Sequence, residues 1–280
     1  MSIAMLVTMC LGFALSISVA VSIGLAALLG TWLSNVNMLL SVKEIYTALN
    51  KFPLAAIPFF ILAGNIMEAG GISRRLVDFA KSVVGGIQGG LSATCVLTCM
   101  IFAAVSGSSV ATTFAIGSIL IPALVKHGYP NTYAAALQAT SAELGVIIPP
   151  SIPMIIFGVS AEVSIGELFI AGIGPGILIS GALMAFVLLN AWYFGYGKQD
   201  REGRLPLIEA TRKAIFALFM PVIILGGIYG GIFTPTEAAV VAVTYVIILG
   251  IAHRTLSWKA LCTEILETST LVGALMVVVA

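Results

Sequence analysis

The sequence predicts an all-α polytopic membrane protein in which one helical run turns back on itself and another is broken. Hydrophobic residues fill 60% of the 280 positions and charged residues 9%, against roughly 25% charged in soluble domains. The mean hydropathy is +1.12. Several apolar runs reach the roughly 20 residues that a helix needs to cross a bilayer. A soluble globular fold is therefore excluded.

The apolar runs are expected to be helices, and the polar stretches between them loops. The first run has no basic segment before it and is too long for the core of a signal peptide, so we expect it to be a retained span. The charged segment 74–81 is expected to be a loop. The expected helices are 3–30, 53–69, 91–125, 132–159, 168–195, 214–233, 237–252 and one that begins near 260.

The run 91–125 is interrupted by Ser106-Gly107-Ser108-Ser109. Each limb of about 15 residues would be about 22 Å long at 1.5 Å per residue, which is short of a core of about 30 Å. A chain can turn back at membrane depth only where its backbone is buried in protein or lines a watery cavity. We therefore expect a re-entrant hairpin.

The run 132–159 contains Gly145 and then Pro149-Pro150-Ser151. The two prolines remove hydrogen-bond donors and hold the preceding residue extended, so the helix must break there. We expect an unwound helix that crosses the membrane.

Basic residues indicate the threading, because Lys and Arg gather in short cytoplasmic loops. If 91–125 is a hairpin, most of them fall on one side, and the N-terminus and the hairpin mouth are cytoplasmic. Lys43, Lys51, Glu162 and Glu167 fall on the other side. The residues on the cytoplasmic side would be Arg74, Arg75, Lys81, Lys126, Lys198, Arg201, Arg204, Arg212, Lys213, Arg254 and Lys259.

The helix ends created by the two breaks are the candidate binding site. The first limbs end near Ser106 and over 145–148, and such negative dipole ends with hydroxyls suit a bare monovalent cation. The second limbs begin near Ser109 and Ser151, where free N–H groups suit a carboxylate. Adjacent cation and anion sites are what a symporter requires. The alternative is that Ser and Gly only permit close helix packing.

Two glutamates lie near or within the spans. Glu143 is an intramembrane carboxylate and hence a candidate proton-coupling group, although it could instead accept hydrogen bonds from Ser141 or from the loop backbone, or pair with Lys126. Glu237 is expected to be structural, because Thr234 and Pro235 before it fit the start of a capped helix.

Other classes of function are not favoured. The net charge of +1 and the lack of a basic cluster argue against nucleic acid. Cys95 and Cys99 share a helix face without a nearby His, so no metal is assigned to them. A serine hydrolase built on Ser106 or Ser108 would need a base in reach, but His127 and His253 lie at span ends. The chain is not expected to be an enzyme.

Four long motifs follow one another along the chain: LAAIPFFILAGNIMEAGGISRRLVDFA, SGSSVATTFAIGSILIPALVKHGY, IIPPSIPMIIFGVSAEVSIGELFIAGIGPGIL and GIFTPTEAAVVAVTY. In this order they resemble the large membrane subunit of the tripartite ATP-independent periplasmic (TRAP) transporters, over nearly the whole chain. The resemblance implies an inverted-repeat, elevator-type transporter of the bacterial inner membrane.

The same resemblance implies import of organic acids such as dicarboxylates, sialic acids or keto acids, coupled usually to sodium and without another cofactor. Its expected partners are a small membrane subunit and a periplasmic solute receptor. The resemblance puts the cation site on Ser106, Gly145, Ile148 and Pro150. Ser108, Ser109 and Ser151 are the candidate substrate residues.

The expected organisation is a first repeat over 1–197, a cytoplasmic loop over 198–213 and the start of a second repeat over 214–280. The hairpin and second break of that repeat would lie beyond residue 280. The sequence therefore leaves open a working transporter subunit and, alternatively, a fragment or docking module that does not transport.

Overall fold

The computed structural model describes residues 2–197 and 205–279, and every regular element in these ranges is a helix. The chain divides into two compact units, each described by itself. One holds the chain up to Leu54 together with the chain from Ser269, and the other holds Ala55–Thr268. The predicted all-α multi-pass fold is confirmed.

The first unit begins with two short helices where one span was predicted. Helices α1 (Ser2–Ala14) and α2 (Val19–Leu33) fold back and pack on each other. The run 3–30 breaks between them because Ser16 takes a left-handed conformation, with φ of 57°, which ends a right-handed helix. Helix α3 (Met38–Leu49) and a 3₁₀ turn, η1 (Phe52–Ala55), follow.

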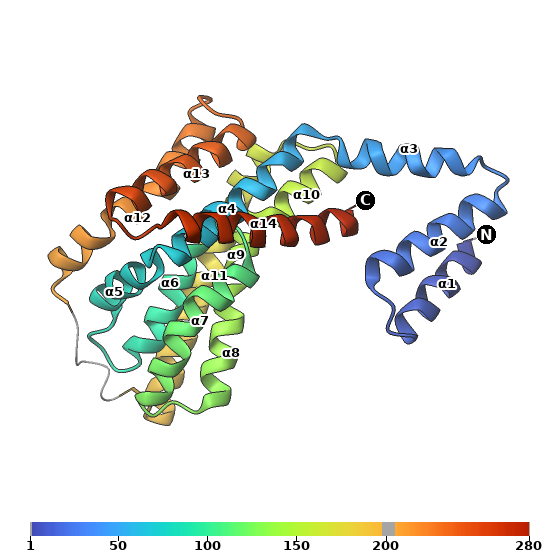
Figure 1. Ribbon diagram of the computed structural model, residues 1–280. Helices are drawn as coiled ribbons and strands as arrows, with labels where there is room; N and C mark the ends of the chain where they lie inside the picture. Colours follow the sequence, from blue (N-terminus) through green and yellow to red (C-terminus); the bar gives the residue numbers. More distant parts are fainter. Residues whose placement is uncertain (1, 198–204, 280) are drawn as a thin grey trace. The chain divides into compact units, whose positions relative to one another are not determined.

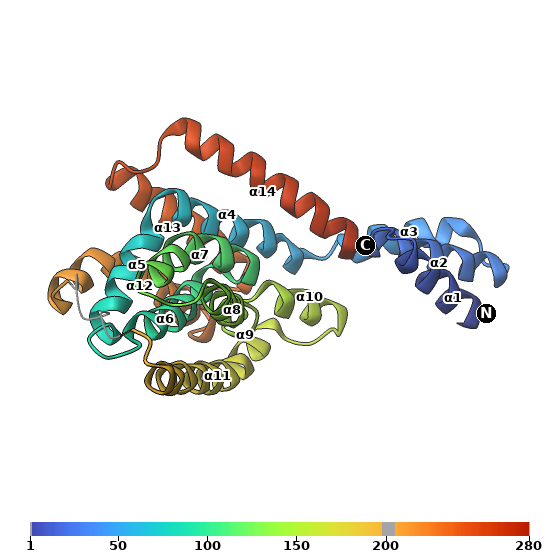
Figure 2. The same cartoon turned by 90° about the horizontal axis from the view of Figure 1, so that it is seen from below.

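The second unit is built around α6 (Gly90–Ser106), which packs against seven other helices (Figures 1 and 2). All of these helices are predominantly apolar except α5 and α8, as expected for a bundle in lipid. The elements of the unit are α4 (Ala56–Ala69), α5 (Ile72–Val84), α6, α7 (Ser109–Lys126), α8 (Asn131–Ala142), α9 (Leu144–Ile147), α10 (Ile152–Ser160), α11 (Ile165–Phe194), α12 (Leu207–Tyr229), α13 (Pro235–Ala252) and the first half of α14 (Trp258–Val279).

The charged segment expected to be a loop is the amphipathic helix α5. Ile72, Leu76, Val77 and Ala80 are buried on one of its faces. This spacing is that of a helix with a single apolar stripe. The prediction of a loop was wrong because it relied on the charged residues of the segment and overlooked the helical spacing of its apolar residues.

The turn-back predicted in 91–125 lies at Gly107–Ser108, between α6 and α7. Gln138 of α8 proves the fold-back, because it touches both limbs. Its Oε1 accepts from Cys95 Sγ at 3.1 Å, and its Nε2 donates to Thr112 O at 3.2 Å. In a straight helix these two residues would be about 25 Å apart along the axis.

The break predicted in 132–159 is present as well. Helices α8 and α9 are followed by a non-helical stretch at 148–151 and then by α10, and the chain bends by 42°. Six helices in the described ranges are long and apolar enough to cross a membrane, and the bent pair would be a seventh span.

The start of α12 differs from the sequence prediction, whereas the start of α13 agrees with it. Helix α12 begins at Leu207, so residues 207–213 are helical and not part of a loop. Lys198, Arg201 and Arg204, predicted to be cytoplasmic, lie outside the described residues. At α13 the predicted structural role of Glu237 is confirmed: Thr234 and Glu237 form a reciprocal capping box.

Candidate functional site

The tip of the hairpin is a tight turn centred on Gly107. This residue ends α6 in the left-handed conformation, with φ of +63°, which glycine adopts at little cost. Ser108 then returns to an extended conformation, and its Oγ accepts from Ala111 N at 3.3 Å. The side chain of Ser108 thus caps α7.

Helix α10 begins in the same way after the second break. Ser151 has φ of −134° and ψ of 126°, almost equal to the −134° and 123° of Ser108. Its Oγ accepts from Met154 N at 3.4 Å and donates to Val146 O at 2.6 Å. Each break therefore ends in a serine-capped helix N-terminus.

The two breaks meet in space. Ile152 N donates to Gly107 O at 3.0 Å, which joins the start of α10 to the tip of the hairpin. A Cβ added to Gly107 would lie 2.6 Å from Pro150 O, and one added to Gly145 would lie 2.9 Å from Ser108 O. The two glycines let the backbones approach more closely than any side chain would allow.

Buried hydroxyls surround this contact. Ser106 and Thr112 are almost completely buried, and their oxygens lie 3.3 Å apart. Thr112 uses its only proton on Ser108 O, at 2.7 Å, so Ser106 must be the donor of the pair. The lone pairs of the Ser106 oxygen are left as potential ligands for a cation.

Ser141 lies four residues before Gly145, near the end of α8. The two positions lie on one face because they are four residues apart, and Glu143 between them keeps a helical backbone (φ −62°, ψ −17°). Ser141 Oγ is buried and has no hydrogen-bond partner among the described residues. Such an atom calls for an explanation, and an ion is one.

The structure brings most of the predicted site residues together. Gly145 and Pro150 contact the tip that follows Ser106. Ile148 lies in the unwound stretch, and its side chain packs toward Gly176 of α11, where an added Cβ would be 2.8 Å from Ile148 Cγ1. Their roles in binding a cation stay predictions.

The candidate substrate residues lie at the two helix starts. Ser108 and Ser151 use their oxygens as caps, and Ser109 is the half-buried first residue of α7. What they offer a carboxylate is therefore mainly the partial positive charge of the helix N-termini.

Glu143 is exposed at the end of α8, outside the contact between the two breaks. Two of the alternatives for it are not realised: Ser141 Oγ donates to no described group, and no described cation pairs with the Glu143 carboxylate. Its role in coupling stays a prediction.

Sequence reasoning missed Thr112, Gln138 and Ser141. Gln138 is fully buried between the limbs of the hairpin, and the signal was a lone amide within an apolar span. Thr112 stands four residues after Ser108 and Ser141 four before Gly145, so helical spacing from the two breaks would have singled them out.

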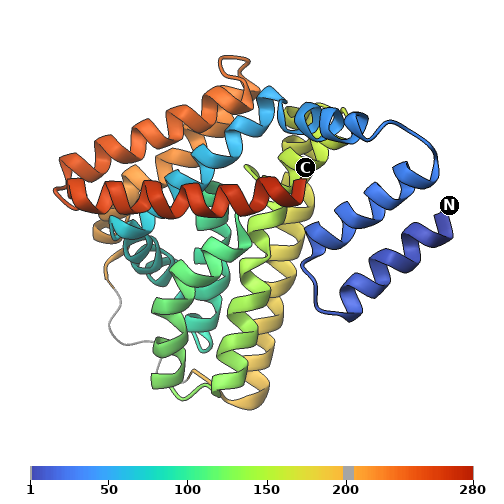
Figure 3. The same ribbon diagram turned by 45° about the vertical axis from the view of Figure 1, so that its right-hand side comes forward.

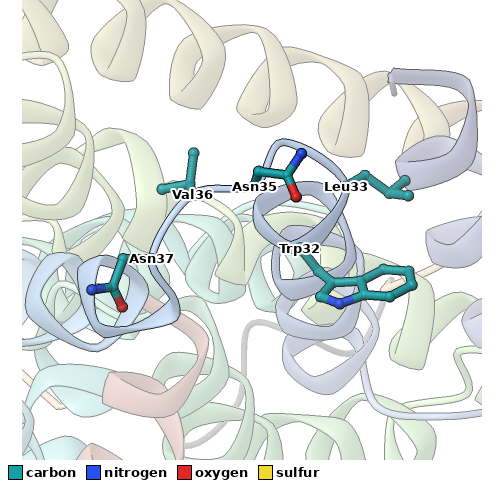
Figure 4. Close-up of a pocket in the computed structure, with 5 residues that line it drawn as sticks. All are labelled: Trp32, Leu33, Asn35, Val36 and Asn37. Atoms are coloured by element: carbon teal, nitrogen blue, oxygen red, sulfur yellow. The ribbon is translucent and has the colours of Figure 1, made fainter.

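The described residues contain no group of three His, Cys, Asp or Glu side chains that could hold a metal ion. A hollow of about 530 Å³ near α2 and α3 forms no site either. It is lined by Trp32, Leu33, Asn35, Val36 and Asn37. Figure 4 shows that its five side chains diverge rather than converge on one point, and Asn37 is used to cap α3.

Two discontinuous helices that meet at buried hydroxyls are the arrangement that secondary transporters use to bind ions and substrates, and the fold points to that class. Residues 3–280 match the family described as the DctM component of tripartite ATP-independent periplasmic transporters. This chain belongs to that family.

Curated relatives carry the same family name and are named as permeases, not enzymes. The chain is 45% identical over 269 residues to the isethionate TRAP transporter permease of Oleidesulfovibrio alaskensis, covering 93% of this chain and 42% of that protein. It is 40% identical over 261 residues to the C4-dicarboxylate large permease of Pseudomonas aeruginosa, covering 92% and 61%.

A third relative is the sialic acid TRAP transporter permease of Haemophilus influenzae, 36% identical over 279 residues, covering 99% of this chain and 45% of that protein. The chain spans about half the length of the curated relatives that it matches.

Proposed function

We propose that this chain is part of the large permease of an organic-acid importer of the bacterial inner membrane, driven by sodium. The observation that carries the proposal is the hydrogen bond from Ile152 N to Gly107 O, which fixes two helix breaks against each other. In secondary transporters such breaks bind the coupling ion and the anionic substrate.

The proposed cation site lies at Ser106, Gly145, Ile148 and Pro150. Its oxygens would be the Ser106 hydroxyl, backbone carbonyls of the unwound stretch and the unpaired Ser141 hydroxyl. Hydroxyl and carbonyl oxygens are the ligands that hard cations prefer. The carboxylate of the substrate would lie at the N-termini of α7 and α10, near Ser108, Ser109 and Ser151.

The proposed assembly follows the names of the relatives, which are dicarboxylate, sialic acid and isethionate permeases. It comprises a small membrane subunit and a periplasmic receptor. Residues 1–197 would form the first repeat of an elevator, and the chain from α12 onward, 207–280, would form the start of the second repeat. The N-terminus would be cytoplasmic.

The test measures sodium binding separately from transport. The purified chain is melted in detergent with sodium or with choline as the cation. A ligand at 100 times its Kd stabilises the folded state by about 2.7 kcal/mol, so sodium should raise the Tm of the unaltered chain. Ser106→Ala and Ser141→Ala should remove this rise. Ser118→Ala, on an exposed part of α7, is the control.

Uptake of labelled organic acids is then measured in proteoliposomes that also hold the small subunit and the receptor. Sodium-dependent uptake that Ser106→Ala abolishes would support a working transporter. A sodium-dependent Tm without uptake would mean that this chain binds sodium but does not transport by itself. Equal melting in sodium and choline would refute the cation site.

A further inference from the structure

A groove between α8 and α11 is separate from the two breaks. It has a volume of about 270 Å³ and is lined by residues of both helices, which run in roughly the same direction in Figure 3. Most of its lining is apolar. Tyr133 and Asn190 lie at one end, and Thr140, whose hydroxyl donates to Ala136 O, lies toward the other. The lining residues are Tyr133, Ala136, Leu137 and Thr140 of α8 and Leu183, Phe186, Val187 and Asn190 of α11.

The polar end of the groove lies at the level of the membrane interface. Trp192 and Tyr193, two and three residues after Asn190, are 75% and 77% exposed. Exposed aromatics at the end of a span mark the headgroup region. From Asn190 to Leu183 the groove runs about 10 Å deeper, at 1.5 Å per residue.

The protein does not satisfy Asn190 at the polar end. Its Oδ1 is buried and accepts no hydrogen bond from the described residues, whereas the Tyr133 hydroxyl lies beside the Ser92 hydroxyl. Tyr133 is held in place by ring contacts with Tyr129 and Tyr196, at centroid distances of 5.7 and 5.8 Å. A buried acceptor without a donor is unfavourable, so a ligand that donates to Asn190 would be stabilised here.

The size of the groove favours a lipid chain over a protein helix. A 10 Å length of helix with a diameter of about 10 Å fills roughly 800 Å³, three times the groove. A methylene group is close in size to a water molecule, whose share of the liquid is about 30 Å³, so the groove holds about nine. Phe186 and Leu189 beside it are 59% and 66% exposed, as residues that face lipid are.

We propose that this groove binds one phospholipid, with an acyl chain between α8 and α11 and a headgroup that donates a hydrogen bond to Asn190. The headgroup must carry an N–H or O–H. Phosphatidylethanolamine has such a donor and phosphatidylcholine has none. This inference does not depend on the cation site.

The test uses vesicles of phosphatidylethanolamine and phosphatidylcholine in equal amounts. The chain is reconstituted, extracted in mild detergent, and its retained lipids are counted by native mass spectrometry. We expect one retained lipid, enriched about tenfold in phosphatidylethanolamine, since a hydrogen bond to a charged group is worth about that factor. Asn190→Leu should remove the enrichment.

A matched pair of variants tests the apolar part. Ala136→Phe fills the groove and should abolish retention, while Ala135→Phe changes an exposed neighbour outside the lining and should not. Retention that is equal in the two variants, or an absence of retained lipid in the unaltered chain, would overturn the proposal.

A direct probe covers the case in which Ala136→Phe does not fold. A photoreactive benzoylphenylalanine replaces Phe186 in the complex with the small membrane subunit, and the products are analysed after detergent exchange. A lipid adduct supports the proposal. An adduct with a peptide of the subunit would assign the groove to a protein partner and refute it.

Discussion

Gly107 is the residue on which the contact between the two breaks depends most directly. Its left-handed φ of +63° and the closeness of Pro150 O each exclude a side chain. Other glycines of the same protein face open space, so the requirement at Gly107 comes from this contact and not from a general need for small residues in membrane helices.

Gly107→Ala should therefore destabilise the protein by about 2–4 kcal/mol, since a left-handed alanine costs about 1–2 kcal/mol and the added Cβ would lie 2.6 Å from Pro150 O. Thermal unfolding in detergent measures this loss. The control is Gly181→Ala in α11, where an added Cβ meets nothing within 4 Å. Equal melting of the two variants would contradict the close approach.

At the scale of elements, the sequence predicts the two breaks well because their causes are local. Glycine between serines, and two adjacent prolines, end a helix whatever surrounds them. The same holds for the capping box at Thr234 and Glu237. The contact between the breaks could not be predicted in this way, since it joins residues more than 40 positions apart.

The elements that were missed fail for a physical reason too. Helix α5 carries Arg74, Arg75 and Lys81 on its polar face, and average hydropathy hides an amphipathic helix that its period reveals. In the first apolar run, composition hid a break instead of a helix. Its apolar residues suggest one span, whereas the left-handed conformation of Ser16 divides it into two helices.

Gln138 is expected to hold the hairpin closed. Its amide bonds Cys95 on one limb and Thr112 on the other, so Gln138→Leu should cost about 1–3 kcal/mol by leaving buried groups unpaired. Amide hydrogen exchange over 109–116 should become faster. Ala139→Leu, on the exposed face of α8, is the control. Unchanged exchange in Gln138→Leu would mean that packing alone closes the hairpin.

At the scale of the whole molecule, the structure gathers basic groups from distant parts of the second unit. Arg75 of α5, Lys213 of α12 and His253 after α13 line one small cavity. A shared side for these positions is what the positive-inside argument needs. The side of the N-terminus needs its own test. Its prediction assumed that 3–30 crosses the membrane once, whereas α1 and α2 fold back on each other.

Labelling with a membrane-impermeant maleimide determines the orientation of the chain. The exposed Cys10 and Cys262 are first replaced by Ser, while Cys95 and Cys99 are buried and should not react. Lys213→Cys should then react only in inverted vesicles, because basic segments stay in the cytoplasm. Glu162→Cys, between α10 and α11, should react in intact cells.

Ser2→Cys tests the predicted side of the N-terminus in the same assay. Like Lys213→Cys, it should react with the maleimide in inverted vesicles. Reaction of Ser2→Cys in intact cells, with Lys213→Cys still protected, would mean that α1 and α2 together cross the membrane an even number of times, and not once as predicted. The basic segments would then still fix the orientation of the second unit, since its helices carry the Lys and Arg on which the positive-inside rule acts.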